Sequence, residues 1–242
     1  QTILSRMFAS LRRLGAGCWR KIATAGAAGA VTLTGGAATC MPLPEWASQA
    51  PPEGKAAATA AKYEESTEWV RADISLAGGG EGHAIFDTLG AKTNAVPMYR
   101  IYARRDGTAV AAVATAAAGC DGHKGIVHGG VTALLLDNTL GWTNAVAVLA
   151  DSGTLSAILD GAPMSDVQAK GGSPARFGFT ANLLVNYRAP FKNGSTVELV
   201  CKVDRVEGRK RFLVGEMRDV ASGTLIADCT SLFIIPRAPA GG

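Results

Sequence analysis

The sequence of 242 residues is poor in the side chains that build metal and redox centres. It holds only three histidines, and it has no Cys-x-x-Cys pair. Its five cysteines are odd in number and irregularly spaced, at Cys18, Cys40, Cys120, Cys201 and Cys229. This spacing excludes the common zinc patterns and argues against a disulfide framework. We therefore expect reduced, mostly buried thiols, no metal and no cofactor of the protein's own.

Acidic residues are absent from the first 44 positions, where the first 21 residues read QTILSRMFASLRRLGAGCWRK. Five of the 24 basic residues precede the first acid, Glu45, so the rest of the chain is close to neutral although the formal net charge is +4. A near-neutral main part argues against a nucleic-acid-binding surface. The basic, roughly amphipathic start has the composition of an organelle transit peptide.

A long run of large apolar residues is also missing. Residues 22–44 carry no charge and would be long enough to span a bilayer, but they are mostly Ala, Gly and Thr. Small residues four positions apart, such as Gly26 and Ala30, suit close helix packing in a membrane or against a partner. Two interpretations therefore stay open: a membrane-spanning or partner-packed helix, and the low-complexity remnant of a targeting segment.

The next part of the chain changes character twice. Four prolines between positions 42 and 52 break regular structure, and residues 55–69 (KAAATAAKYEESTEW) have high helix propensity. His83 follows a glycine-rich loop, and we expect it to be a surface residue without a role. The expected organisation is a basic targeting-like segment at 1–44, a linker and helical extension at 45–94, a folded domain at 95–237 and a tail at 238–242.

The folded domain has a recognisable order of elements. Residues 96–104 alternate like a strand, and Asp106-Gly107 is a hairpin-turn signal before a weaker strand at 108–118. Residues 129–150 are apolar on nearly every side and predict one long buried helix. An antiparallel meander of four strands then follows, at 177–187, 196–206, 211–220 and 224–235. The predicted class is α+β, an antiparallel sheet wrapped around one long buried helix.

The run HGGVTALLLD at 128–137 carries the chemistry. His128, Gly129 and Gly130 open the helix, and Asp137 interrupts its apolar sequence. An acid at a core position is rare without a partner or a function. Paired glycines leave backbone N–H groups approachable at a helix start, where the helix dipole favours negative charge. This combination predicts a site that polarises a carbonyl and supplies a carboxylate nearby.

Four stretches, in this order, resemble the hot-dog fold of acyl-CoA thioesterases, and the HGG-type thioesterase superfamily with its mitochondrial members in particular. They are GIVHGGVTALLLDNTLG (125–141), TANLLVNYRAP (180–190), VDRVEGRKRF (203–212) and TSLFIIP (230–236). The resemblance implies hydrolysis of an acyl-CoA thioester to free acid and coenzyme A, which enters only as part of the substrate. It also implies a homodimer or a hot-dog heterodimer.

The resemblance assigns roles within the motif. Asp137 is expected to act as base or nucleophile, and the N–H groups of Gly129 and Gly130 to polarise the thioester carbonyl. Nine residues of helix rise about 13 Å, so Asp137 cannot serve the first turn of its own helix and the site needs a second chain. The family's threonine near the acid corresponds to Thr180. His128 either caps the helix or transfers a proton.

Further residues are candidates for contacts with the substrate. Asn138 follows the acid and is expected to contact the acyl-CoA. Basic residues near two turns are candidates for the coenzyme A phosphates, namely Arg188, Arg209, Lys210 and Arg211. Structural alternatives stay open: a solvated hairpin end for the basic cluster, tight sheet–helix packing for the glycines, and a non-catalytic core acid at Asp137. Trp142 is expected in the core or in the lining of an acyl pocket.

Residues 150–179 form a longer connection than the family leads us to expect. This insertion could reshape the acyl pocket or meet a partner. With the basic N-terminus, it keeps a second function open, a non-catalytic or moonlighting accessory subunit of a mitochondrial membrane (respiratory) complex. Binding of acyl-CoA without turnover is a third. The expected location is the mitochondrion, in association with the inner membrane, and the plastid is the alternative.

Overall fold

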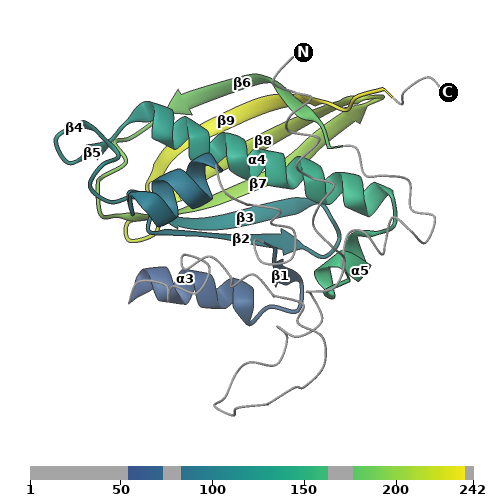
Figure 1. Ribbon diagram of the computed structural model, residues 1–242, viewed down its shortest axis with the longest axis horizontal. Coiled ribbons are helices and arrows are strands. Elements are labelled where there is room, and N and C mark those ends of the chain that lie inside the picture. Colours follow the sequence, from purple (N-terminus) through teal and green to yellow (C-terminus); the bar gives the residue numbers. More distant parts are fainter. Residues whose placement is uncertain (1–53, 73–82, 163–176, 238–242) are drawn as a thin grey trace, which may run out of the picture.

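A curved antiparallel sheet wraps around one long helix in the computed structural model, which describes residues 54–72, 83–162 and 177–237 (Figure 1). The seven strands lie in the order β1-β2-β3-β7-β8-β9-β6, and α4 (Gly129–Asp151) crosses the concave face. This is the hot-dog fold, and it confirms the predicted α+β class. The strands are β1 (Trp69–Arg71), β2 (Met98–Arg104), β3 (Ala109–Thr115), β6 (Phe179–Tyr187), β7 (Thr196–Glu207), β8 (Lys210–Asp219) and β9 (Leu225–Ile234).

The strand order differs from the predicted meander in one respect. β6 pairs with β9, with Thr180 opposite Phe233, whereas β7 pairs with β3. The turn signal at Asn193-Gly194 therefore ends a crossover between distant strands and not a hairpin. β6 becomes an edge strand beside α4, and its outer edge has no strand partner among the described residues.

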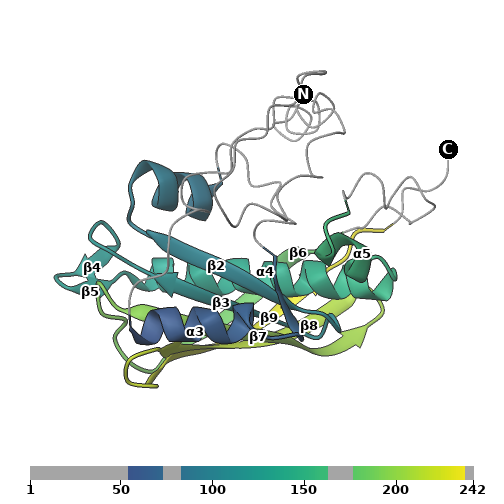
Figure 2. The same cartoon turned by 90° about the horizontal axis from the view of Figure 1, so that it is seen from below.

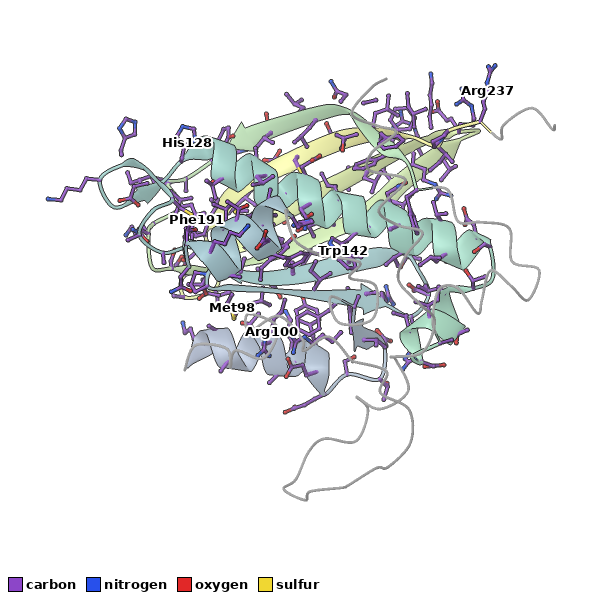
Figure 3. The ribbon with its side chains drawn as sticks, viewed as in Figure 1. Met98, Arg100, His128, Trp142, Phe191 and Arg237 are labelled. Carbon is purple, nitrogen blue, oxygen red and sulfur yellow. The ribbon has the colours of Figure 1, made fainter. Side chains whose placement is uncertain are left out.

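The core lies between α4 and the concave face of the sheet. Leu135, Leu136, Leu140 and Leu149 on α4 are fully buried, and each contributes about 1.5–3 kcal/mol to stability. The sheet faces them with Ile101, Leu199, Leu213 and Met217, which are also buried. Trp142 is partly buried and packs against this cluster, so it lies at the core, which was one of the two places predicted for it (Figure 3).

A second helix, α3 (Lys55–Glu64), covers the other face of β2 and β3 (Figure 2). Tyr63 stacks on Tyr102 with ring centroids 4.9 Å apart, and both side chains are buried. The predicted helix at 55–69 ends early because Ser66 and Thr67 favour helix caps and turns, while Trp69 and Val70 favour a strand. The segment expected to be a linker and helical extension thus adds β1 to the sheet.

Four shorter elements flank α4. These are the π-helix η2 (Ala84–Lys92), the hairpin of β4 (Asp121–His123) and β5 (Ile126–Val127), and the helix α5 (Leu155–Leu159). His83 is not an idle surface residue as expected: it is half-buried, and its Nδ1 accepts the N–H groups of Ile85 and Phe86 at 3.2 and 3.3 Å. It therefore caps η2.

Within the described ranges, no helix combines the length and the apolar character that a membrane crossing requires. The candidate span at 22–44 and the middle of the insertion, residues 163–176, lie outside those ranges.

The buried thiols allow a first test of the fold. Cys120, Cys201 and Cys229 are free and buried, and burial raises the pKa of all three, that of Cys229 to about 12. Because the thiolate is the reactive form, native protein is expected to resist an aromatic disulfide reagent near pH 8 and to react after unfolding in urea. The measurement uses a Cys18→Ser/Cys40→Ser variant, which retains only these three thiols. Rapid modification of the native protein would contradict their burial.

Candidate active site

At the first turn of α4, the N–H groups of Gly129 and Gly130 differ in whether they have an acceptor. The Nδ1 atom of His128 accepts the N–H of Gly130 at 2.9 Å, so the imidazole caps the helix (Figure 3). The N–H of Gly129 has no acceptor within the described part of the chain. The prediction of two open N–H groups is therefore wrong for Gly130, and Gly129 carries the open donor.

The glycines around His128 also have a packing role. A Cβ atom at Gly122 would lie 2.9 Å from His128 Cδ2, and one at Gly130 would lie 3.0 Å from Nδ1. Either side chain would push the imidazole out of its capping position. The small residues at positions 122 and 130 therefore keep His128 in its capping position.

Tyr187 contacts the same turn and was not among the predicted site residues. Its hydroxyl donates to the carbonyl oxygen of Gly129 at 2.8 Å. Its ring lies against the glycine, since a Cβ atom at Gly129 would stand 3.4 Å from the tyrosine Cζ and Oη atoms. In the sequence, Tyr187 is an ordinary strand residue, and only the packing of β6 beside α4 brings it to the helix.

The acid and the threonine meet as the resemblance led us to expect. The Thr180 hydroxyl donates to Asp137 Oδ1 at 3.0 Å, and the carboxylate is half-buried. This bond fixes the orientation of the carboxylate at the start of β6. Asp137 is eight residues beyond Gly129 on a regular helix, or about 12 Å along its axis, so the two ends of the motif do not meet in one chain.

Asn138 points toward β2. Its Nδ2 donates to the Tyr99 hydroxyl at 3.1 Å, and the same hydroxyl bonds to Thr139 Oγ1 at 2.8 Å. Asn138 therefore has a structural partner, and its contact with substrate stays a prediction.

The predicted phosphate-binding cluster at 209–211 is divided in the structure. Arg211 points inward and is only 7% exposed, and its guanidinium forms an ion pair with Asp151 in the last turn of α4. The expectation that Arg211 meets phosphates is contradicted, because this side chain is buried and already paired. Adjacent side chains on a strand point to opposite faces, which separates Arg211 from Lys210. Arg209 and Lys210 remain exposed, and Arg209 Nη1 donates to the Ile235 carbonyl at 3.0 Å.

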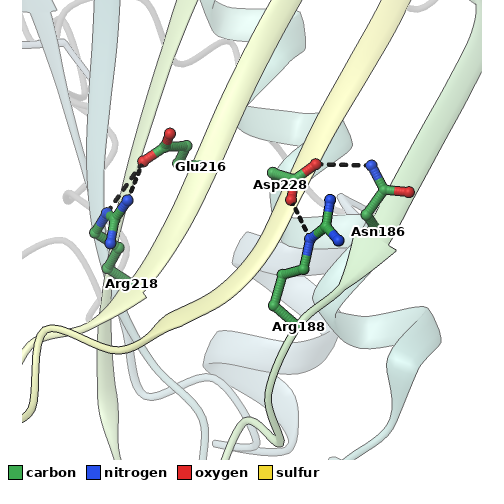
Figure 4. A network of polar contacts seen from close by, with 5 residues as sticks. All are labelled: Asn186, Arg188, Glu216, Arg218 and Asp228. Atoms are coloured by element: carbon green, nitrogen blue, oxygen red, sulfur yellow. Dashed lines mark hydrogen bonds and ion pairs between the residues drawn. The ribbon is translucent and has the colours of Figure 1, made fainter.

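Arg188 is held at the other end of β6 (Figure 4). Its Nε donates to Asp228 Oδ2 at 2.5 Å, while Asp228 Oδ1 accepts from Asn186 Nδ2 at 2.7 Å. The hydrogen bond from Arg188 lowers the pKa of Asp228, so this pair stays charged. The Arg188 side chain is 54% exposed, and its two terminal nitrogens have no partner among the described residues.

These basic residues do not form one cluster in a single chain. Arg188 directly follows Tyr187, but its side chain lies beside Asp228 and Asn186, on the face of the sheet away from the helix (Figure 4). Lys210 pairs with Ile234, which pairs with Phe179 at the opposite end of β6. The strand between them spans about 26 Å, so one phosphate cannot reach both ends.

The site thus combines an acid oriented by a threonine with an open amide at the start of the central helix. The chain is similar to acyl-coenzyme A thioesterase THEM4, with 30% identity over 113 residues to the protein of Bos taurus and 31% over 114 residues to that of Xenopus laevis. Each match covers 47% of this chain but 35% and 39% of those proteins, so the chain spans little more than a third of their length.

No family model matches the chain. Among solved structures, a thioesterase superfamily protein is 28% identical with a TM-score of 0.42, over 57% of this chain and 54% of that one.

Proposed function

We propose that the protein hydrolyses an acyl-CoA thioester to a free acid and coenzyme A. The observation that carries the proposal is Asp137 on the central helix, oriented by Thr180 at 3.0 Å. The open N–H of Gly129 supplies the complementary group for a carbonyl oxygen. The similarity to curated acyl-CoA thioesterases supports the substrate class.

In the proposed reaction, Asp137 takes a proton from water as the water oxygen bonds to the thioester carbon. The carbonyl oxygen becomes an oxyanion, which the Gly129 N–H and the positive end of the helix dipole stabilise. The intermediate then breaks its carbon–sulfur bond, and the leaving thiolate of coenzyme A takes up the proton. Direct attack by the Asp137 carboxylate through an anhydride is the other route open to these groups.

Two copies of the chain would complete the site. The acid and the open amide of one chain are about 12 Å apart along α4, too far for one thioester. The outer edge of β6 has no strand partner among the described residues, and the strand carries exposed large side chains, Phe179 at 72%, Leu184 at 55% and Tyr187 at 55%. A two-fold partner paired along β6 would bring the first turn of one α4 to the Asp137 of the other. A homodimer is the simplest case, and a second hot-dog chain would serve equally.

The position of Arg188 predicts how the coenzyme A phosphates are held. Arg188→Gln is expected to raise the KM for acyl-CoA by about tenfold, because a charge-assisted contact to phosphate is lost. Hydrolysis of an N-acetylcysteamine thioester, which lacks the phosphates, should be unchanged. Arg218→Gln is the matched control, since Arg218 is also exposed on the sheet and also pairs with a carboxylate, that of Glu216 at 2.7 Å (Figure 4). If Arg209→Gln and Lys210→Gln raise the KM while Arg188→Gln does not, the phosphates bind at the other end of β6.

We also propose a mitochondrial location with inner-membrane association, which the acid-free, basic start of the sequence supports. Fractionation of the full chain in cells tests it. Recovery in the cytosolic fraction would overturn the proposal, and release from mitochondria by alkaline carbonate would overturn the membrane association. Migration with a respiratory complex in mild detergent would add the accessory-subunit role.

The enzymatic proposal is tested by assaying the full chain on acyl-CoA substrates of graded acyl length, with detection of the released thiol. Free acid and coenzyme A are expected in equal amounts for at least one length. Absence of release by protein that is folded and dimeric would overturn the proposal. Saturable binding without release would favour an acyl-CoA-binding module instead.

A further inference from the structure

Tyr187 contacts the first turn of α4, and the proposed reaction gives it no part. It ends β6, the strand whose first residues include Thr180. Its hydroxyl donates to the Gly129 carbonyl oxygen at 2.8 Å, and its ring is in contact with the glycine. The edge strand β6 therefore contacts both halves of the motif. Thr180 bonds to the acid, Asp137, and Tyr187 bonds to Gly129, the residue with the open N–H.

The contact acts on a particular peptide unit. The carbonyl of Gly129 and the N–H of Gly130 belong to the same planar group. Tyr187 binds its oxygen, and His128 Nδ1 accepts its N–H at 2.9 Å. Held at both ends, this group cannot rotate without losing one of the two bonds. The open Gly129 N–H belongs to the preceding peptide group, which joins this one at the Gly129 Cα. Fixing one group restrains the other, which matters because two successive glycines have more backbone freedom than any other pair of residues.

We propose that Tyr187 is a positioning residue for thioester hydrolysis, which holds the first turn of α4 so that the Gly129 N–H points at the carbonyl oxygen of the substrate. The inference rests on the proposed function. Tyr187 acts through Gly129 and not on the substrate, because its hydroxyl proton is already donated to the glycine oxygen. A hydrogen-bond donor stabilises an oxyanion effectively only when it is fixed in the right direction before charge develops.

Tyr187 affects the site that contains the Asp137 of the partner chain. The first turn of α4 lies about 12 Å from its own Asp137, so it serves the acid of the partner copy. Thr180, in contrast, orients the acid of its own chain. A change at Tyr187 therefore impairs the site that contains the partner's acid and spares the site that contains its own.

Tyr187→Phe tests the positioning role, since it removes the hydroxyl and keeps the ring. We expect kcat to fall about tenfold, with the KM, the pH profile and the melting temperature unchanged. Tyr63→Phe is the matched control: Tyr63 donates its hydroxyl to Glu198 at 2.7 Å on the opposite face of the sheet, and its loss should leave kcat unchanged. A Tyr187→Phe protein with the kcat of the unaltered chain, or one that loses activity only because it melts, overturns the proposal.

Mixed dimers test which site Tyr187 serves. Chains carrying Asp137→Asn and Tyr187→Phe are expressed together with different tags, and the heterodimer is isolated. One site then holds both changes and the other holds neither, so about half of the unaltered activity per dimer is expected. Activity below that of the Tyr187→Phe homodimer overturns action across the interface. Absence of turnover by the unaltered chain would instead overturn the proposed function itself, and this inference with it.

Discussion

Asp137→Asn is expected to lower the rate of acyl-CoA hydrolysis by about 10³-fold or more, with the fold intact. The amide has nearly the size of the carboxylate and can still accept the Thr180 hydroxyl through its oxygen. It cannot take a proton from water or attack a thioester. The loss should therefore appear in kcat, while the KM and the melting temperature stay close to those of the unaltered protein.

The control for this prediction is another carboxylate in a polar setting. Asp219 is the half-buried last residue of β8, and its Oδ1 accepts from the N–H and the hydroxyl of Ser222, both at 2.7 Å. Asp219→Asn makes the same carboxylate-to-amide change at a residue that bonds Ser222 and no residue of the proposed site, so it should leave kcat unchanged. An Asp137→Asn protein that keeps more than about a tenth of the activity would show that Asp137 is neither base nor nucleophile.

Local patterns predicted most of the elements around the site. The apolar run predicted a helix at 129–150, and α4 occupies Gly129–Asp151. Strand alternation and turn residues placed β7, β8 and β9 within a few residues of their ends. These signals succeed because helix and strand periodicities, and the glycines that end them, are properties of neighbouring residues.

Contacts between distant residues were not predictable in the same way. The pairing of β6 with β9, and the bond from Tyr187 to Gly129 that follows from it, depend on how the sheet packs around α4. The sequence also could not decide which glycine N–H stays open, because that depends on the rotamer of His128. The acid–threonine pair was anticipated only through the family resemblance, since 43 residues separate Asp137 from Thr180.

Gly107→Ala is expected to have the largest effect on stability, lowering the free energy of unfolding by about 2–4 kcal/mol. Gly107 turns the chain between β2 and β3 with φ of 77°, a conformation that disfavours a side chain. A Cβ atom there would also lie 2.3 Å from the Cβ of Ala150 in the last turn of α4. The melting temperature of the domain should fall by about 6–12 °C.

Two further variants separate the backbone cost from the steric cost. Gly223→Ala places a side chain at φ of 73° with no atom within 4 Å, so it should cost only the backbone part, about 1 kcal/mol. Combining Gly107→Ala with Ala150→Gly removes the overlap, and the double-mutant cycle should return a coupling of about 1–3 kcal/mol. A coupling near zero would show that the β2–β3 turn does not touch α4. The hairpin signal at Asp106-Gly107 predicts only the backbone cost of Gly107→Ala. The steric cost arises because the sheet brings this turn against the last turn of α4, the helix that also carries Asp137.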